Sequence, residues 1–280
     1  MLLINNFHAL GTSCFLEIFD DLDQKNFNLI MEYLILEIIN FENNFSRFKE
    51  NSLIGQLNKN KKLNYNSEDL FKMLSISQDM NLITNGIFNI AIAQILESNG
   101  YGGNYLEGNK FFPEQKDVLK FDSSSVEIAS NIKIDLGGIG KGYLIEKISL
   151  ILKNKFHLKY FLINFGGDIY ATTDRGNKIK IDLENPNIPG MKIGSIFLTN
   201  NSVCCSSNSK RNWTIQDKTF YHILDPESKK VNFSSFVIST STTIGDIVAT
   251  CLCIDPNISE NFNNIGFLIV DEFGQVVKMR

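Results

Sequence analysis

The stretch Ile134-Asp-Leu-Gly-Gly-Ile-Gly-Lys-Gly-Tyr143 carries more information about fold and function than any other part of the chain. It places four glycines around one cation, Lys141, directly after residues 126–136, whose alternating pattern predicts a strand. Residues 143–153 have helical apolar spacing, so we expect the loop to open a helix whose N-terminal dipole favours anions. Glycine permits close backbone approach, and lysine supplies positive charge. The stretch predicts a phosphate-bearing ligand; the alternative is a purely structural tight turn.

The loop matches neither of two common phosphate-binding motifs. The Walker A pattern G-x-x-x-x-G-K-[ST] requires glycine at 135 and serine or threonine at 142, where this chain has Asp135 and Gly142. The dinucleotide pattern G-x-G-x-x-G fails because its last glycine would fall on Tyr143 or Ile145. The ligand class therefore has to be inferred from other residues.

Composition limits the classes of protein to be considered. The chain has 280 residues, 43% of them apolar, and a net charge of −4, which argues against nucleic acid as a main partner. No run approaches the ~18 apolar residues of a membrane span, so no membrane span is expected. The start shows no export signal, so we expect a cytoplasmic protein, exported only if an N-terminal signal was removed. The five cysteines have no disulfide-like spacing and are expected to be small core residues: Cys14, Cys204, Cys205, Cys251 and Cys253.

The pattern of elements predicts an α+β fold. Helices are expected over 23–44, 67–85 and 240–254. Strands are expected over 15–19, 161–169 with an interruption at its glycine pair, 178–183 and 194–198, with a closing hairpin of 265–270 and 276–279. Residues 98–112 predict an irregular excursion, and 199–213 a loop. Helices and strands are segregated, and no linker divides the chain, which is typical of α+β proteins.

A second group of candidate residues lies in Thr242-Thr-Ile-Gly-Asp-Ile-Val-Ala-Thr250. If this segment is helical, Asp246 and Thr250 are four residues apart and lie on one face. A carboxylate and a hydroxyl are hard oxygen ligands suited to Mg²⁺. The alternative is structural: Asp246 would balance the helix dipole, and Thr250 would hydrogen-bond to a main-chain carbonyl.

Two further segments contain candidate residues, each with a structural alternative. The segment Phe220-Tyr-His-Ile-Leu-Asp-Pro226 contains His222, a candidate proton shuttle beside a phosphate and otherwise a structural histidine. The segment Asn164-Phe-Gly-Gly-Asp168 ends a strand in a glycine pair, where backbone can approach a flat ligand. Its alternative is a turn capped by an Asx side chain.

In chain order, these segments resemble the motifs of the FAD:protein FMN transferase family, also called the ApbE or flavin transferase family. Residues 135–143 resemble its Asp-Leu-Gly-Gly-Ile-Ala-Lys-Gly-Tyr signature, and 162–168 resemble Leu-Ile-Asn-x-Gly-Gly-Asp. Residues 221–226 resemble His-Ile-x-Asp-Pro, and 246–250 resemble Asp-Ala-x-Ala-Thr. Residues 7–12 and 45–58 are similar to its opening Met-Gly-Thr and Phe-Ser segments. The likeness spans nearly the whole chain.

The resemblance implies one α+β domain of the ApbE type over residues 1–280, with mixed or antiparallel sheets flanked by helices. It implies Mg²⁺-dependent cleavage of FAD, transfer of FMN to a Thr or Ser hydroxyl of an acceptor flavoprotein, and release of AMP. FAD and that acceptor are the implied partners. Two other functions stay open: hydrolysis of FAD to FMN and AMP, and binding of FAD without turnover.

The resemblance also implies roles for individual residues. The metal would be held by Asp246, Thr250 and the carbonyl of Gly140, which stands where the family has alanine. Lys141, His222 and Asp246 would be catalytic. The implied FAD-binding residues are Asp135, Gly137, Gly138, Lys141, Ser207, His222 and Ile223. Two departures from the family pattern concern this site: Asn89 stands where a carboxylate is usual, and Asn208 replaces the glycine after the serine.

Overall fold

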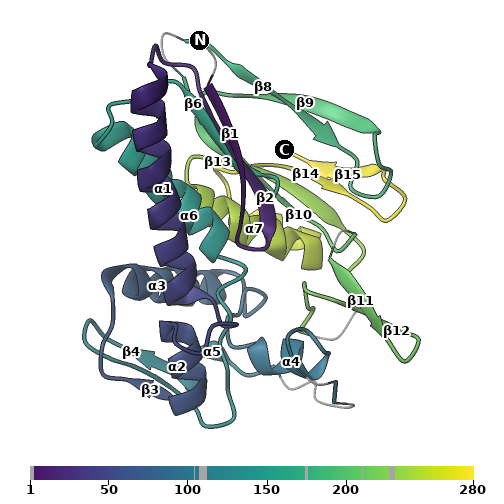
Figure 1. The fold of residues 1–280 in the computed structure, drawn as a ribbon. Coiled ribbons are helices and arrows are strands. Elements are labelled where there is room, and N and C mark those ends of the chain that lie inside the picture. The colour runs from purple at the N-terminus through teal and green to yellow at the C-terminus, as the bar shows by residue number, and fades with distance from the viewer. Residues whose placement is uncertain (1–2, 104, 107–111, 174–175, 210, 227–230) are drawn as a thin grey trace.

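The computed structural model describes residues 3–103, 105–106, 112–173, 176–209, 211–226 and 231–280. Its centre is an eight-stranded antiparallel sheet with strand order β1-β2-β6-β7-β10-β13-β14-β15 (Figure 1). The strands are β1 (Leu3–Ala9), β2 (Thr12–Ile18), β6 (Phe161–Phe165), β7 (Asp168–Thr172), β10 (Asn200–Ser206), β13 (Ser234–Ser239), β14 (Gly266–Val270) and β15 (Val276–Met279).

Successive side chains of this sheet point into two separate cores, as the alternation of a strand requires. On one face, Phe161, Ile163 and Phe165 join a large core. The helices that contribute to this core include α1 (Gln24–Phe45), α6 (Gly140–Asn154) and α7 (Thr242–Ile254). On the other face, Leu162 joins a smaller core with the hairpin of β8 (Ile179–Glu184) and β9 (Lys192–Leu198). Helices thus cover one face and a hairpin part of the other, which confirms the α+β class.

The remaining elements lie mostly away from the large sheet, in the lower part of Figure 1. The helices are α2 (Leu53–Asn60), α3 (Glu68–Ile83), α4 (Ala93–Ser98), α5 (Gln115–Val118) and the 3₁₀ helix η1 (Pro256–Asn261). A three-stranded sheet is formed by β3 (Lys62–Leu63), β5 (Val126–Ile128) and β4 (Leu119–Phe121). A separate hairpin is formed by β11 (Asn212–Ile215) and β12 (Lys218–Tyr221).

Two expectations about secondary structure are wrong. Residues 199–213 are not a loop, because they contain β10, an interior strand of the large sheet, and the start of β11. Residues 126–136 form a strand only over Val126–Ile128; beyond it, Ile134 pairs with the side chain of Asn58 in place of a neighbouring strand. The predicted excursion 98–112 falls partly outside the described residues, at 104 and 107–111.

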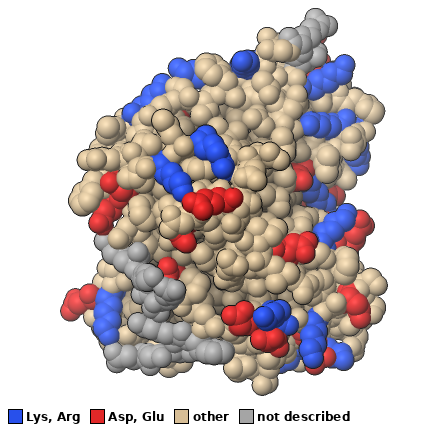
Figure 2. Space-filling view, turned by 180° about the vertical axis from the view of Figure 1, so that it is seen from behind, with Lys and Arg blue, Asp and Glu red and all other residues tan. Residues whose placement is uncertain are grey.

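The cysteines are mostly buried, as expected for small core residues. Cys14, Cys204, Cys251 and Cys253 are buried, while Cys205 is half-buried. No helix among the described residues is long and apolar enough to cross a membrane. Most of the face in Figure 2 is formed by uncharged residues, with basic and acidic side chains in small separate groups.

Candidate functional site

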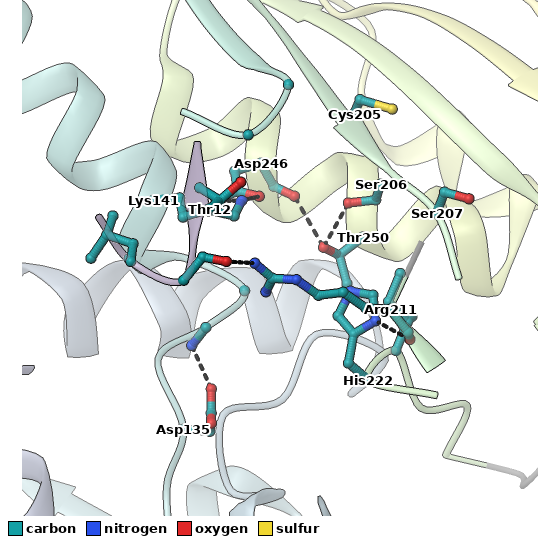
Figure 3. A pocket seen from close by; sticks show the side chains of 18 of the residues that line it. Thr12, Asp135, Lys141, Cys205, Ser206, Ser207, Arg211, His222, Asp246 and Thr250 are labelled. Carbon is teal, nitrogen blue, oxygen red and sulfur yellow. Dashed lines mark hydrogen bonds and ion pairs between the residues drawn. The ribbon is translucent and has the colours of Figure 1, made fainter. Parts of the chain in front are cut away.

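A cavity of about 1470 Å³ brings together the four segments singled out from the sequence. Its wall includes the first turn of α6, the turn between β6 and β7, one face of α7 and the residues that follow β12 (Figure 3). Sites for small molecules usually measure about 300–1,000 Å³. This cavity is therefore large enough for a ligand of dinucleotide size with room for a second group.

The ammonium group of Lys141 lies between two buried carboxylates. Its Nζ donates to Oδ2 of Asp168 and lies 3.3 Å from Oδ1 of Asp246. The two carboxylate side chains are only 2% and 3% exposed. Burial by itself would lower the pKa of Lys141, but the two carboxylates outweigh burial and raise that pKa. The cavity wall therefore carries a lasting positive charge at the position that the sequence predicted.

Asp246 also caps the beginning of α6. Its Oδ2 accepts a hydrogen bond of 2.9 Å from the main-chain N–H of Gly142. A Cβ atom on Gly142 would lie 2.6 Å from the carbonyl oxygen of Thr242 and 2.7 Å from Cβ of Asp246, so only glycine permits this helix contact. The helix begins at Gly140, three residues before the expected start, and a carboxylate of the protein already faces its N-terminal N–H groups. The anion that this end of the helix favours is thus supplied by the protein itself, and its contact with a phosphate stays a prediction.

Asp246 and Thr250 lie one turn apart on α7, as predicted. The Thr250 hydroxyl donates to the main-chain oxygen of Asp246 at 3.2 Å and lies 3.2 Å from the Ser206 hydroxyl. Thr250 thus makes the main-chain hydrogen bond that was its structural alternative, and it also lines the cavity. Gly140 lines the same cavity, and a Cβ there would meet only a ring carbon of Phe41 at 3.8 Å. Alanine would fit at this position.

The chemistry of these donors fits a hard divalent cation. Burial raises the pKa of Asp246, which shows that its negative charge is costly where it lies. Two buried carboxylates, Asp168 and Asp246, share one ammonium, so an additional positive charge would be favourable. Within the described part of the chain, no group of three or more His, Cys, Asp or Glu side chains is placed to hold a metal. A cation here would be held by Asp246 with the oxygens of Thr250 and Gly140.

His222 lies on the cavity wall in its neutral form. Burial lowers the pKa of its imidazole to about 4. Its Nδ1 lies 3.1 Å from the carbonyl oxygen of Arg211, and because a carbonyl can only accept, Nδ1 carries the proton. Nε2 then keeps its lone pair. At neutral pH the imidazole is therefore uncharged, and it supplies no positive charge to a phosphate.

Asp135 shapes the glycine turn and forms an ion pair with an arginine whose side chain is buried. Its Oδ1 accepts from the N–H of Gly137 at 2.5 Å, and its Oδ2 pairs with Nε of Arg47. Arg47 is 3% exposed and also donates to the main-chain oxygen of Tyr101 at 2.9 Å. A Cβ on Gly138 would lie 3.3 Å from the ring of Phe88, which is a tight contact. Asp135 and the glycine turn therefore line the cavity as predicted, and Arg47 is a member of the site that the sequence reading missed.

Ser207 and Ile223 both line the cavity, but each is held by neighbouring residues. The Ser207 hydroxyl lies 2.8 Å from the hydroxyl groups of Ser209 and Ser234. The main-chain N–H of Ile223 donates to the side-chain oxygen of Asn208 at 3.3 Å, and its carbonyl accepts from the same amide at 3.4 Å. The asparagine that departs from the family pattern thus fixes the backbone beside His222.

The turn at 164–168 matches its structural alternative. The Asn164 side chain accepts from the N–H of Gly167 at 2.9 Å, which is the Asx-capped turn. The turn nevertheless delivers Asp168 to the site, where its Oδ1 accepts from the N–H of Cys205 at 3.0 Å and its Oδ2 holds Lys141. Sequence reasoning did not assign Asp168; an acid directly after a glycine pair within a strand was the available signal.

Aromatic rings form another part of the wall. Tyr101 and Trp213 are stacked, with ring centroids 5.0 Å apart and an interplanar angle of 23°. The Arg47 guanidinium lies 4.1 Å from the ring centroid of Phe48. The wall therefore offers flat apolar surfaces suited to a planar ring system.

Asn89, which stands where the family usually has a carboxylate, donates to the carbonyl oxygen of Pro113 at 2.8 Å. A carboxylate could not make this bond.

Comparison with known proteins gives a consistent picture. The model of the ApbE family matches residues 10–261. An "FAD:protein FMN transferase" of Klebsiella pneumoniae is 26% identical over 201 residues, which are 66% of this chain and 62% of that protein. One of Buchnera aphidicola is 28% identical over 207 residues, or 65% of this chain and 59% of that protein. The chain thus matches about three fifths of the length of these relatives.

Solved structures share the fold. The ApbE protein of Thermotoga maritima gives a TM-score of 0.87 at 23% identity, covering 99% of this chain and 97% of that one. The flavin transferase ApbE of Vibrio cholerae gives a TM-score of 0.81 at 15% identity, covering 100% and 96%. Both likenesses confirm the predicted type of fold.

Proposed function

The chain belongs to the ApbE family, and we propose that it transfers FMN from FAD to a Thr or Ser hydroxyl of an acceptor flavoprotein in a Mg²⁺-dependent reaction that releases AMP. The names of the matching relatives support the transferase activity. One observation carries the proposal: Lys141, the pair Asp246 and Thr250, and His222, from three separate segments, line a single cavity.

The cavity suits FAD in both its charged and its flat parts. The pyrophosphate would lie near Lys141, whose raised pKa keeps it charged. The stacked rings of Tyr101 and Trp213 offer a surface for one of the two planar ring systems of FAD. Asp135 and the turn at Gly137 and Gly138 line the same cavity.

The transfer of FMN breaks one bond and forms another at phosphorus, and it needs no oxidant or reductant. The acceptor hydroxyl oxygen forms a bond to the phosphorus atom of the FMN half of FAD, and the pyrophosphate bond to AMP breaks. AMP leaves with the bridging oxygen, and the hydroxyl proton passes to a base. A divalent cation held by Asp246, Thr250 and Gly140 would stabilise charge on the phosphoryl oxygens. Lys141 would neutralise the leaving phosphate.

His222 is the candidate base for the hydroxyl proton. At pH 7 its imidazole is neutral, so the lone pair at Nε2 would accept the hydroxyl proton as the bond to phosphorus forms, while the Arg211 carbonyl fixes the ring through Nδ1. A threonine hydroxyl is a weak nucleophile until it is deprotonated, so a base in this position has a clear use.

Incubation with FAD, Mg²⁺ and a candidate acceptor flavoprotein tests the proposal. We expect flavin fluorescence on the acceptor band of a denaturing gel, and none with EDTA or with Asp246→Ala. An acceptor whose Thr or Ser is replaced by Ala serves as the control. Free FMN and AMP without a labelled acceptor would instead indicate FAD hydrolysis, and intact bound FAD would indicate a binding protein. Unchanged labelling by Asp246→Ala would contradict the metal assignment.

A further inference from the structure

The two carboxylates beside Lys141 are held in different ways. Asp168 is fixed through Oδ1 by the N–H of Cys205, and its Oδ2 faces the ammonium. Asp246 is fixed through Oδ2 by the N–H of Gly142, and the same ammonium lies 3.3 Å from its Oδ1 and 3.5 Å from its Oδ2. Each carboxylate therefore has one oxygen committed to the backbone and one oxygen available to a cation.

Two cations can contact the available oxygen of Asp246: the proposed metal ion and the Lys141 ammonium. This oxygen is the acidic ligand of the metal site described above, and it is also within contact distance of Lys141. An ammonium and a divalent cation repel each other strongly in a partly buried site. Lysine has a flexible stem and three rotatable N–H groups, so its ammonium can shift between neighbouring carboxylates. Its contact with Asp168 is already the closer of the two.

We propose that Asp168 is a positioning residue that retains the Lys141 ammonium when a divalent cation binds Asp246, so that lysine and cation compete for one carboxylate. The inference rests on the metal site of the proposed function. With Asp168 in place, the lysine has a second counter-ion and releases Asp246. Without Asp168, the lysine depends on Asp246 alone and competes with the cation more strongly. The lysine then stays charged beside the cation, where the leaving phosphate would need it.

Titration of the full chain with Mn²⁺, without FAD, tests this competition. The electron paramagnetic resonance signal of free Mn²⁺ reports the Kd for wild type, Lys141→Met, Asp168→Asn and the double variant. We expect Lys141→Met to lower the Kd about tenfold and Asp168→Asn to raise it about tenfold. Removing the lysine from the Asp168→Asn protein should lower the Kd by more than it does in wild type. Far-UV circular dichroism checks folding, and if Lys141→Met is unfolded, the comparison of Asp168→Asn with the double variant decides.

A second ion pair on α6 provides the matched control. Lys147 Nζ lies 2.5 Å from Asp69 Oδ2. Lys147→Met and Asp69→Asn make the same changes in net charge and should leave the Mn²⁺ affinity within about twofold, because general charge effects are screened. Parallel shifts in both pairs would overturn the proposal.

The variant Asp246→Asn separates two kinds of failure. If it binds Mn²⁺ as wild type does, the metal assignment is wrong and this proposal is wrong with it. If it loses Mn²⁺ binding while the lysine-free proteins bind no more tightly than their lysine-containing parents, only the competition is wrong. Loss of binding in Asp246→Asn together with tighter binding in the lysine-free proteins supports both.

Discussion

Replacement of Gly142 by alanine tests the close contact between α6 and α7 that aligns Lys141 with Asp246. The new Cβ would lie 2.6 Å from the Thr242 carbonyl oxygen and 2.7 Å from the Asp246 Cβ, whereas ordinary contacts begin at 3.4 Å. Neither atom is the end of a flexible side chain, so the two helices would have to separate. Overpacking of this kind costs about 1–3 kcal/mol of unfolding free energy. The separation would also lengthen the 2.9 Å hydrogen bond from Gly142 to Asp246.

Gly140→Ala is the matched comparison, two residues earlier in the same helix. Its Cβ would meet only Phe41 at 3.8 Å, and alanine restricts the unfolded chain, so we expect stability to be unchanged or to rise by about 0.5–1 kcal/mol. Urea unfolding followed by circular dichroism gives both values, and Mn²⁺ titration reports the alignment of Asp246. Equal stability of the two variants would refute the packing role of Gly142.

Three further predictions concern other parts of the site. Asp246→Asn should remove Mg²⁺-dependent labelling of the acceptor while the protein stays folded; labelling at the wild-type rate would contradict its role as metal ligand. Because burial lowers the pKa of His222 from 6.5 to about 4, the unfolded chain binds the proton first as pH falls. The stability of wild type relative to His222→Gln should therefore decrease from pH 6.5 towards pH 4 in urea unfolding, and a constant difference would count against the buried neutral imidazole. Arg47→Met removes the cation that pairs with the Asp135 carboxylate, which is 14% exposed, and should cost about 1–3 kcal/mol. Lys72→Met, in an exposed pair with Glu68, should cost under about 0.5 kcal/mol; similar losses in the two unfolding curves would argue against the arginine's role.

The elements with clear periodicity could be predicted from the sequence. The apolar pattern placed α7, and the turn residues placed the hairpin of β14 and β15. Strand β10 was not predicted because it begins with polar residues, and their hydrogen-bond partners lie far away in the sequence. The hydroxyl of Ser202 bonds to the carbonyl of Ser239, and Asn200 bonds to Thr172. An interior strand satisfied by such bonds shows no apolar alternation.

The candidate site was predictable where its residues lie within short motifs. Asp246 and Thr250 share one helical turn, and Lys141 lies inside a glycine-rich loop. Arg47 and Asp168 were not assigned because their roles depend on partners outside their own segments. Arg47 meets Asp135 across 88 positions of sequence, and Asp168 meets Lys141 across 27. The spacing of residues within one segment cannot reveal ion pairs between distant segments.

The proposed function requires one cavity to bind FAD and a divalent cation and to pass FMN to an acceptor. The most direct measurement compares two amounts in one reaction with FAD, Mg²⁺ and a candidate acceptor: AMP by chromatography and acceptor-bound flavin by mass spectrometry of the intact protein. We expect equal amounts of both, and neither when EDTA is present. AMP accompanied by free FMN and an unmodified acceptor, or equal transfer in EDTA, would contradict the proposed function.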